Sequence, residues 1–566
     1  MSSQSAPFTK ADAVAAFFAD NDVPAVFELS GGMIAFLTDA VARLGKTSII
    51  NTRHEQAAGF AAEGATRISG NSAVAMGTSG PGATNLITAI ASSYFDSVPT
   101  IFITGQVNQN ELKKSVEQRQ NGFQELDIVQ AVRGITKYAV AIDSKADLVG
   151  ELQKSWELAR EGRPGPVLLD IPIDVQQEVL PKLTSYLTNV DSMSASSADE
   201  LQVEKLLELV AKSERPIFLL GGGIRTADSA SLMRLILDRW KIPAVYSLMA
   251  IDVLDSSSPY RIGMIGSYGN RWANRAIAKA DLVIALGTRL DVRQTGSDPT
   301  SFIQGKKIFR VDVDESEING RIQADISVNV LLQSFIASLA KIDFQVDRSA
   351  WLASIQAEAA ELPQQQEQPK SVTFNPHEIM QWISSVFKDS NGYVVDVGQH
   401  QMWAAQSLSI EPNQRVLTSG GLGAMGFALP AAIGACISKS GRWIVIAGDG
   451  CTQLSIAELQ TLRQYNLPIT LCIVNNGQHG MVAQFQETNM DGRYISTRDG
   501  YSTPNFCSLA QAFGIEARRF ECSEDLGKSV DFVSQWDDGP IILEFMVSLE
   551  AKALPKMGMG SSIQDL

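Results

Sequence analysis

The chain has 566 residues, too many for one hydrophobic core, so we expect two to four domains. Hydrophobic residues make up 45% and charged residues 19%, a balance typical of globular proteins with large cores. A formal net charge of −15 argues against nucleic acid or an anionic membrane as a partner, because both need a basic face. The sequence contains no apolar run of membrane-spanning length and no signal-peptide pattern, and its five cysteines lack metal-type spacing. We therefore expect a cytoplasmic protein with reduced thiols.

Short apolar strands alternate with helical stretches along the whole chain, which is the pattern of βαβ units and parallel sheets. The predicted strands form three groups. The first contains AVFELSGG, SIINTRHE, SAVAMGTSGPG, TIFITGQ and GPVLLDIP. The second contains PIFLLGGG, PAVYSLM, DLVIALGTRLD and KIFRVDVDESE, and the third contains YVVDVGQ, WIVIAGDG, ITLCIVNN and PIILEFMV.

Two stretches of biased composition separate these groups, a polar one at 184–200 and a Gln- and Pro-rich one at 361–371. We therefore predict an α/β fold made of three doubly wound domains with mainly parallel sheets. The predicted domains cover residues 1–183, 184–345 and 373–566, with a linker over 346–372.

Two strands of the third group end in small polar residues. One runs into GDG at 448–450, and the next, 469–474, runs into NNG at 475–477. Because ligands of open parallel sheets bind at the carboxyl ends of strands, Asp449 and Asn476 should lie side by side. Their oxygens suit Mg²⁺, and the glycines let main-chain N–H groups approach a diphosphate. Each tripeptide alone is as typical of an ordinary turn, but the pair at this spacing favours a binding site.

This pair resembles the GDG…NN motif of thiamine-diphosphate enzymes. Other segments are similar to the acetohydroxyacid (acetolactate) synthase branch of that family, and the match spans nearly the whole chain. They are NTRHEQAAGFAAEG at 51–64, GFQELDIVQ at 122–130, VGQHQMWAAQ at 397–406, TSGGLGAMGFALPAAIG at 418–434 and the tail LPKMGMGSS at 554–562. The resemblance implies a carboligase that decarboxylates pyruvate and transfers the two-carbon acetyl unit to a second 2-keto acid.

The family's catalytic roles can be carried over residue by residue. Glu55 matches the glutamate that hydrogen-bonds the aminopyrimidine ring and so promotes proton removal from the thiazolium carbon. Met425 matches the residue that holds the cofactor bent, Gly423 the carbonyl that meets its exocyclic amine, and Phe123 and Gln124 the residues beside the reacting centre. The other expected contacts of thiamine diphosphate are Gly31, Gly32, Gln399, His400, Gly448, Asp449, Gly450, Asn476, Gln478, Gly480 and Met481, with Asp449, Asn476 and Gln478 as the metal ligands.

The middle group resembles the FAD-binding domain of the same family, in which the flavin is expected to be structural. Its glycine-rich LLGGGIR turn is a weak sign of nucleotide binding by itself. The resemblance gives Arg163 and Arg293 as flavin contacts and Asp312 as the partner of a ribose. Ile265 stands where the family has histidine, and a related domain without flavin is the alternative. The residues expected around FAD are Arg163, Gly221, Gly222, Gly223, Ser247, Leu248, Gly263, Met264, Gly266, Gly287, Arg289, Asp291, Arg293, Asp312 and Ile318.

Two departures from the family concern the acceptor substrate. The loop 107–122 is longer than in the amino-acid biosynthetic enzymes, and Phe485 replaces a tryptophan of the acceptor pocket. A smaller ring leaves a wider pocket with modest selectivity. A keto sugar, ketone or aldehyde acceptor therefore remains an alternative, as does a simple 2-keto acid decarboxylase or oxidase. A non-catalytic nucleotide-binding relic would not need Glu55 together with Asp449.

The positions of the expected catalytic residues also bear on assembly. Glu55 belongs to the first predicted domain and Asp449 to the third, yet one cofactor must contact both. In the family, the first domain of one chain meets the third domain of another. We therefore expect a homodimer or homotetramer, with a regulatory subunit as a further candidate partner.

Overall fold

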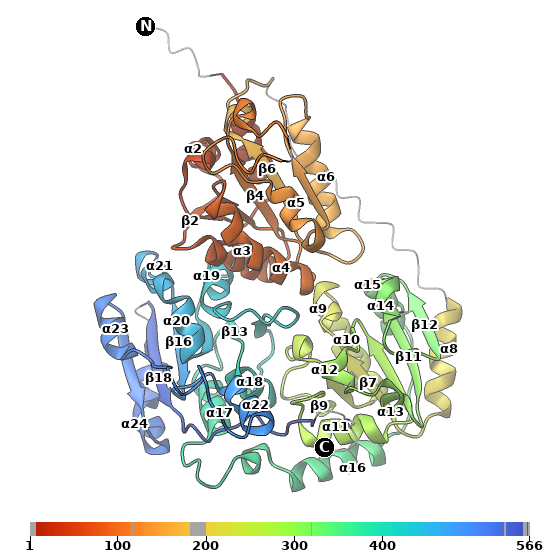
Figure 1. The fold of residues 1–566 in the computed structure, drawn as a ribbon. Coiled ribbons are helices and arrows are strands. Elements are labelled where there is room, and N and C mark those ends of the chain that lie inside the picture. Colours follow the sequence, from red (N-terminus) through yellow and green to blue (C-terminus); the bar gives the residue numbers. More distant parts are fainter. Residues whose placement is uncertain are drawn as a thin grey trace.

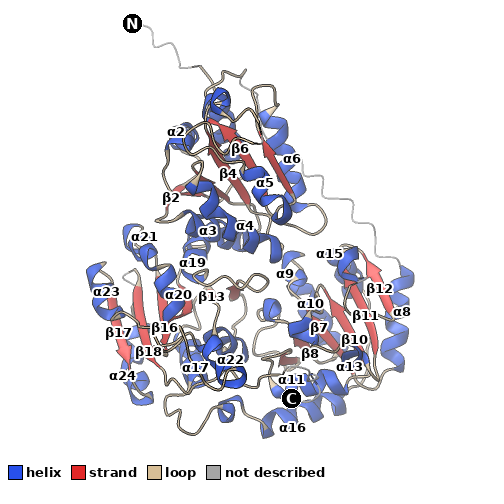
Figure 2. Cartoon of the chain, in the orientation of Figure 1, coloured by secondary structure: helices blue, strands red, loops and turns tan. Residues whose placement is uncertain are grey.

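The computed structural model describes residues 7–115, 117–181, 200–318, 320–536, 539–558 and 563. They form three six-stranded sheets, and every pairing between the named strands is parallel. Figure 1 shows the first unit above the other two, and Figure 2 shows helices on both sides of the strands. The predicted α/β class with three parallel sheets is confirmed.

The first sheet has the strand order β2-β1-β3-β4-β6-β5. Its strands are β1 Val26–Glu28, β2 Ile49–Asn51, β3 Val74–Gly77, β4 Ile101–Gln106, β5 Tyr138–Ala141 and β6 Val167–Pro172. The helices of this unit are α1 Lys10–Asp20, η1 Gly32–Ile34, α2 Ala35–Leu44, α3 Glu55–Ser69, α4 Pro81–Phe95, η2 Gln109–Glu111, α5 Ile128–Val132, η3 Arg133–Ile135, α6 Leu148–Arg160 and α7 Ile173–Gln176.

The second sheet has the order β12-β11-β10-β7-β8-β9, the arrangement of dinucleotide-binding domains. Its strands are β7 Pro216–Leu220, β8 Ala244–Tyr246, β9 Arg261–Met264, β10 Leu282–Leu286, β11 Lys307–Asp312 and β12 Ile326–Asn329. The helices are α8 Glu200–Lys212, α9 Gly223–Thr226, α10 Ala230–Trp240, η4 Leu248–Ala250, α11 Arg271–Lys279, α12 Val292–Thr295, α13 Pro299–Ile303, α14 Glu315–Ile318, α15 Leu332–Ala340, α16 Ser349–Glu361 and η5 Gln364–Glu367.

The third sheet, β14-β13-β15-β16-β18-β17, repeats the strand order of the first. Its strands are β13 Gly392–Val395, β14 Arg415–Thr418, β15 Trp443–Gly448, β16 Ile469–Asn475, β17 Glu516–Phe520 and β18 Ile541–Met546. The helices are α17 Pro376–Val386, α18 Gln399–Ser407, α19 Ala428–Ser438, α20 Asp449–Leu454, η6 Ile456–Glu458, α21 Leu459–Gln464, α22 Gly480–Asn489, α23 Phe506–Ala512 and α24 Ser523–Ser534.

Both faces of the inner strands, such as β4, β7, β15 and β16, are buried, which explains their nearly continuous apolar sequences. In β15, Trp443 and Val445 point into one core and Ile444 and Ile446 into another. The core on the Trp443 side also contains Phe60 of the first unit, so the first and third units share one hydrophobic core.

The shared core is built around α3 and α19, which occupy the same topological position in their two units, after the second strand. Their backbones approach closely, because a Cβ at Gly64 would overlap the carbonyl of Ala431 and one at Gly434 would overlap that of Ala61. Glycine is therefore required at both crossing points. His54 caps α3 by accepting from the N–H of Gln56, which fixes where this helix begins.

The range predicted as a linker contains α16, whose Trp351 and Ile355 are buried in the second unit's core. The predicted boundary at 183 falls among residues outside the described parts of the chain, as do residues 559–562 of the tail. All five cysteines are free. In the described ranges, no helix combines the length and apolar composition needed to cross a membrane.

Candidate functional site

The GDG and NNG segments lie at one edge of the third sheet. Strands β15 and β16 are neighbours, with Gly448 paired to Val474, so Asp449 and Asn476 follow adjacent strand ends. The Asp449 side chain accepts from the Tyr501 hydroxyl at 3.0 Å. Burial raises the pKa of Asp449 to about 6, although hydrogen bonds from Tyr501 and from the main-chain N–H of Asn476 act in the opposite direction.

Gln399 and His400, at the start of α18, complete this edge. The Asn476 amide donates to Gln399 Oε1 at 2.9 Å, and a Cβ at Gly480 would overlap the same oxygen. His400 packs against Gly448, where a Cβ would lie 3.0 Å from the ring. Burial lowers the pKa of His400 to about 3, and its Nε2 has no hydrogen-bond partner among the described atoms. A neutral ring with an unused nitrogen is thus available at this strand end.

Three more expected residues lie beside this edge. The Gln478 side chain accepts from Arg498 Nε at 2.6 Å and donates to the Leu549 carbonyl at 2.8 Å, so its amide already has protein partners. Gly450 packs under His479, and Met481 is half-buried near the start of α22.

The loop 418–427, which carries Gly423 and Met425, is held by a residue that the sequence analysis missed. Asp396 accepts from the N–H groups of Gly426 and Ala428, each at 2.9 Å. Gly423 has a φ of +71°, and Met425 packs against the shared core. Asp396 directly follows β13, as Asp449 follows β15, and this repeated strand-end carboxylate is the signal that identifies it.

The first unit places Glu55 at the start of α3, where it is buried. Asn85 Nδ2 donates to Glu55 Oε2 at 2.9 Å. The other carboxylate oxygen faces Gly82, where a Cβ would lie 3.2 Å away. Gly31 is the N-cap of η1, and Gly32 is the first residue of that turn.

Phe123 and Gln124 lie on the long loop after β4. Phe123 is 81% exposed, and Gln124 has a φ of +66° and packs against Gly80. The neighbouring Glu125, which the sequence analysis did not select, accepts from the N–H groups of Lys113 at 2.8 Å and Asn121 at 2.7 Å and so shapes the loop.

The chain therefore presents two sets of expected residues. The set around Asp449, which contacts Tyr501, belongs to the third unit. The set around Glu55, which contacts Asn85, belongs to the first unit. Phe485 lies on α22 and is 43% exposed.

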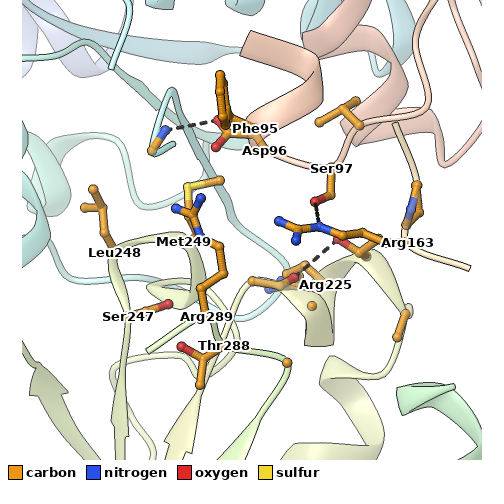
Figure 3. A pocket seen from close by; sticks show the side chains of 18 of the residues that line it. Phe95, Asp96, Ser97, Arg163, Arg225, Ser247, Leu248, Met249, Thr288 and Arg289 are labelled. Atoms are coloured by element: carbon orange, nitrogen blue, oxygen red, sulfur yellow. Dashed lines mark hydrogen bonds between the residues drawn. The ribbon is translucent and has the colours of Figure 1, made fainter. Parts of the chain in front are cut away.

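A cavity of about 520 Å³ lies where the three units meet. Figure 3 shows Ser97 and Arg163 of the first unit across from Ser247 and Thr288 of the second. Eleven of the residues expected around FAD line it: Arg163, Gly222, Gly223, Ser247, Leu248, Met264, Gly287, Arg289, Asp291, Arg293 and Asp312. The lining also includes Ile265, but not Gly221, Gly263, Gly266 or Ile318.

Gly221 lies at the switch point between β7 and β10, where a Cβ would overlap the carbonyl of Gly287. Gly266, with a φ of +110°, packs against the carbonyl of Arg293. Gly263 sits beneath Asn270, and Ile318 is buried at the end of α14. These residues support the cavity from behind.

The cavity is lined by more arginines than acidic residues, of which there are five: Asp96, Asp252, Asp291, Asp312 and Glu317. Seven arginines line it: Arg67, Arg160, Arg163, Arg225, Arg289, Arg293 and Arg415. Arg163 donates to Ser97 Oγ at 2.9 Å and pairs with Asp314 at 3.0 Å and Glu317 at 2.8 Å. Sequence reasoning missed the other four arginines, Arg67, Arg160, Arg225 and Arg415, because no local motif marks them.

Comparison with known proteins agrees with this geometry. Three family models match the chain: Thiamine pyrophosphate enzyme, N-terminal TPP binding domain over residues 8–131, central domain over 203–339 and C-terminal TPP binding domain over 396–545. Thiamine pyrophosphate is another name for thiamine diphosphate.

Curated relatives cover nearly the full length. The chain is 34% identical to an acetolactate synthase large subunit of Corynebacterium glutamicum, over 99% of this chain and 90% of the relative. It is 33% identical to the mitochondrial acetolactate synthase catalytic subunit of Saccharomyces cerevisiae, over 96% and 81%. It is 32% identical to the chloroplastic acetolactate synthase 2 of Nicotiana tabacum, over 96% and 82%. The chain therefore belongs to the acetolactate synthase family of thiamine-diphosphate enzymes.

Proposed function

We propose that this protein decarboxylates pyruvate and transfers the resulting acetyl unit to a second 2-keto acid. The observation that carries the proposal is the buried Glu55 carboxylate, with Asn85 on one oxygen and Gly82, which has no side chain, beside the other. Burying a carboxylate is costly, so a chain without this chemistry would have little reason to keep it there.

Thiamine diphosphate, when bound, would supply a nucleophilic carbon and a positively charged ring nitrogen that accepts the electron pair left by decarboxylation. The chain's own residues orient the group and move a proton. Glu55 would hold a proton at its free oxygen and exchange it with the pyrimidine ring. The loop with Gly423 and Met425, anchored by Asp396, would hold that ring in place.

We propose Mg²⁺ as the ion between Asp449, Asn476 and the diphosphate. The donors fit, because carboxylate and amide oxygens are hard ligands and a cation would offset the cost of burying Asp449. Gln478 would contribute its main-chain carbonyl, since its side chain is held by Arg498.

We propose FAD as the occupant of the three-unit cavity. The strand order of the second sheet, the seven arginines and Asp312 at the end of β11 support a dinucleotide ligand. The Ile265 side chain lies in the same lining, where the family has histidine. The flavin's role would be structural.

Purified protein is expected to be yellow, to release FAD on denaturation and to keep that FAD oxidised during turnover. Arg163→Ala should lower FAD affinity about 10-fold, because it removes a charged hydrogen-bond donor from the cavity. Absorbance and calorimetry would measure both effects. Arg518→Ala, in a separate surface groove, is the control and should keep its flavin. A colourless preparation with full activity would rule out the flavin.

The acceptor is tested by products. The protein should be incubated with pyruvate alone and with 2-ketobutyrate, glyoxylate, aldehydes or a keto sugar, and the products identified. Acetolactate or acetohydroxybutyrate would support the proposal, and a branched sugar would favour the alternative acceptor suggested by Phe485. Acetaldehyde or peroxide alone would indicate a decarboxylase or an oxidase instead.

We propose that the working unit is a homodimer or homotetramer whose sites span two chains. The exposed Phe123 and the apolar side chains of Leu454 and Ile495, 64% and 67% exposed, support an interface on the side of the expected site. A mixture of Glu55→Gln and Asp449→Ala chains should then regain about a quarter of wild-type activity. Half of the random dimers are mixed, and each mixed dimer has one intact site.

Activity should be compared before and after subunit exchange, with native mass spectrometry confirming the mixed dimers. Exchange without recovered activity would mean that each site is built within one chain.

Three finer points stay predictions. The domain boundaries at 183 and 345 await limited proteolysis. Relatives from Corynebacterium glutamicum and Lactococcus lactis are named large subunits, which supports a second, regulatory subunit as a partner. Cytoplasmic localisation is testable by fractionation.

A further inference from the structure

The loop 418–427 is bound at its start by a carboxylate from another unit. Asp96, at the end of α4, accepts from the N–H of Gly421 at 2.7 Å and from that of Gly420 at 3.0 Å. Its side chain is only 1% exposed. Hydrogen bonds to a buried carboxylate are strong and directional, so Asp96 fixes the path of the chain just before Gly423 and Met425.

Arg67 of α3 reinforces this contact. It donates to Asp96 Oδ2 at 2.8 Å and to the carbonyl of Thr418 at 2.9 Å, and it also pairs with Glu63. Burial raises the pKa of Glu63, and the charge of Arg67 opposes that effect. Two first-unit side chains therefore hold the main chain of the loop region at three positions, 418, 420 and 421.

The same residues line the 520 Å³ cavity. Arg67, Asp96 and Gly420 all lie in its lining, and Met249 of the second unit packs so closely on Gly420 that a Cβ there would overlap its thioether. Just upstream of the loop, Asp252 accepts from the Val416 N–H at 3.0 Å. A ligand that fills the cavity therefore contacts the residues that hold the loop.

We propose that Asp96, supported by Arg67, is a positioning residue that couples occupancy of this cavity to the conformation of the loop 418–427. The inference rests on the proposed function, with FAD in the cavity and thiamine diphosphate at the loop. FAD binding strengthens thiamine diphosphate binding because it rigidifies the shared wall. Thermodynamic linkage requires that thiamine diphosphate binding strengthen FAD binding by the same factor.

The test measures this coupling directly. Thiamine diphosphate with Mg²⁺ is titrated calorimetrically into the full-length chain, with and without saturating FAD, and the ratio of the two dissociation constants is taken. For the wild type we expect a ratio of about 10, within the usual range for coupled sites. Asp96→Asn keeps the shape but weakens the anchor, and its ratio should fall close to 1.

Ser97→Ala is the matched control. Ser97 lines the same cavity and accepts from Arg163, so its loss can change FAD affinity while leaving the anchor of the loop intact. Its ratio should stay at the wild-type value. If Asp96→Asn does not fold, as judged by thermal unfolding, the Arg67→Lys variant is measured in its place. Lysine keeps the positive charge but lacks the guanidinium that donates to Asp96 and to the Thr418 carbonyl at the same time.

The outcomes separate the two proposals. A wild-type ratio of 1, or an unchanged ratio in Asp96→Asn, overturns the coupling and leaves the proposed function standing. A wild-type chain that binds no FAD removes the flavin from the proposed function, and the coupling with it.

Discussion

Glu55→Gln is expected to lower turnover about 10²- to 10⁴-fold while the fold and most cofactor affinity are kept. General acid–base groups contribute factors of this size, and glutamine cannot carry the proton. Its amide oxygen can still accept from Asn85, so the local structure should survive. Steady-state product formation measures turnover, and the hydrogen–deuterium exchange rate of the thiazolium carbon of bound thiamine diphosphate measures the step itself.

Glu178→Gln is the matched control, because it makes the same change in the same unit at an ion pair with Lys10. It should leave both rates unchanged. If Glu55→Gln exchanged that proton and decarboxylated pyruvate at the wild-type rate, another group would have to be the proton carrier.

Asp449→Ala should weaken Mg²⁺ and thiamine diphosphate together, by about 100-fold or more. Changes to groups that merely support a metal ligand already cost about 10- to 100-fold, and a direct ligand should cost more. Calorimetric titration of the metal-free chain measures both affinities. Asp491→Ala, whose side chain is 92% exposed, is the control. Unchanged affinity for both ligands in Asp449→Ala would remove Asp449 from the metal site.

The same site predicts a pH dependence. Burial raises the pKa of Asp449 to about 6 in the metal-free chain, and Mg²⁺ binds the deprotonated carboxylate. The proton therefore competes with the ion below this pH and not above it. Mg²⁺ affinity should be flat above about pH 7 and fall by up to about tenfold per pH unit below 6. The Asp449→Asn variant should lose this dependence.

Some site features can be read from local sequence, because the chemistry and its neighbours lie within a few residues. Asp449 and Asn476 follow apolar strands and precede glycines, so their place at a sheet edge was predictable. Asp396 carries the same signal after β13 and lies one residue before the family-like segment 397–406. Gly221, expected among the FAD contacts, lies outside the cavity lining, where the lack of a side chain lets the main chain of Gly287 approach.

The segment 346–372 shows what composition by itself leaves open. The Gln- and Pro-rich stretch at 361–371 suggested a connector, yet the preceding residues form α16. Trp351 and Ile355 give that helix a buried face on the second unit, and Glu358 pairs with Arg275 at 3.0 Å. The spacing of apolar residues in the sequence did not reveal which unit α16 would pack against.

By itself the sequence determined the α/β class, the three parallel sheets and the strand-end residues, since all of these follow from short-range periodicity and turn chemistry. Only the tertiary structure decided that Asp96 and Arg67 would hydrogen-bond the main chain of the loop 418–427. It also decided that arginines from three units would line one cavity. Such contacts join positions hundreds of residues apart, as Arg67 and Thr418 are, 351 residues from each other. Their geometry depends on how α3 and α19 pack, which no local pattern encodes.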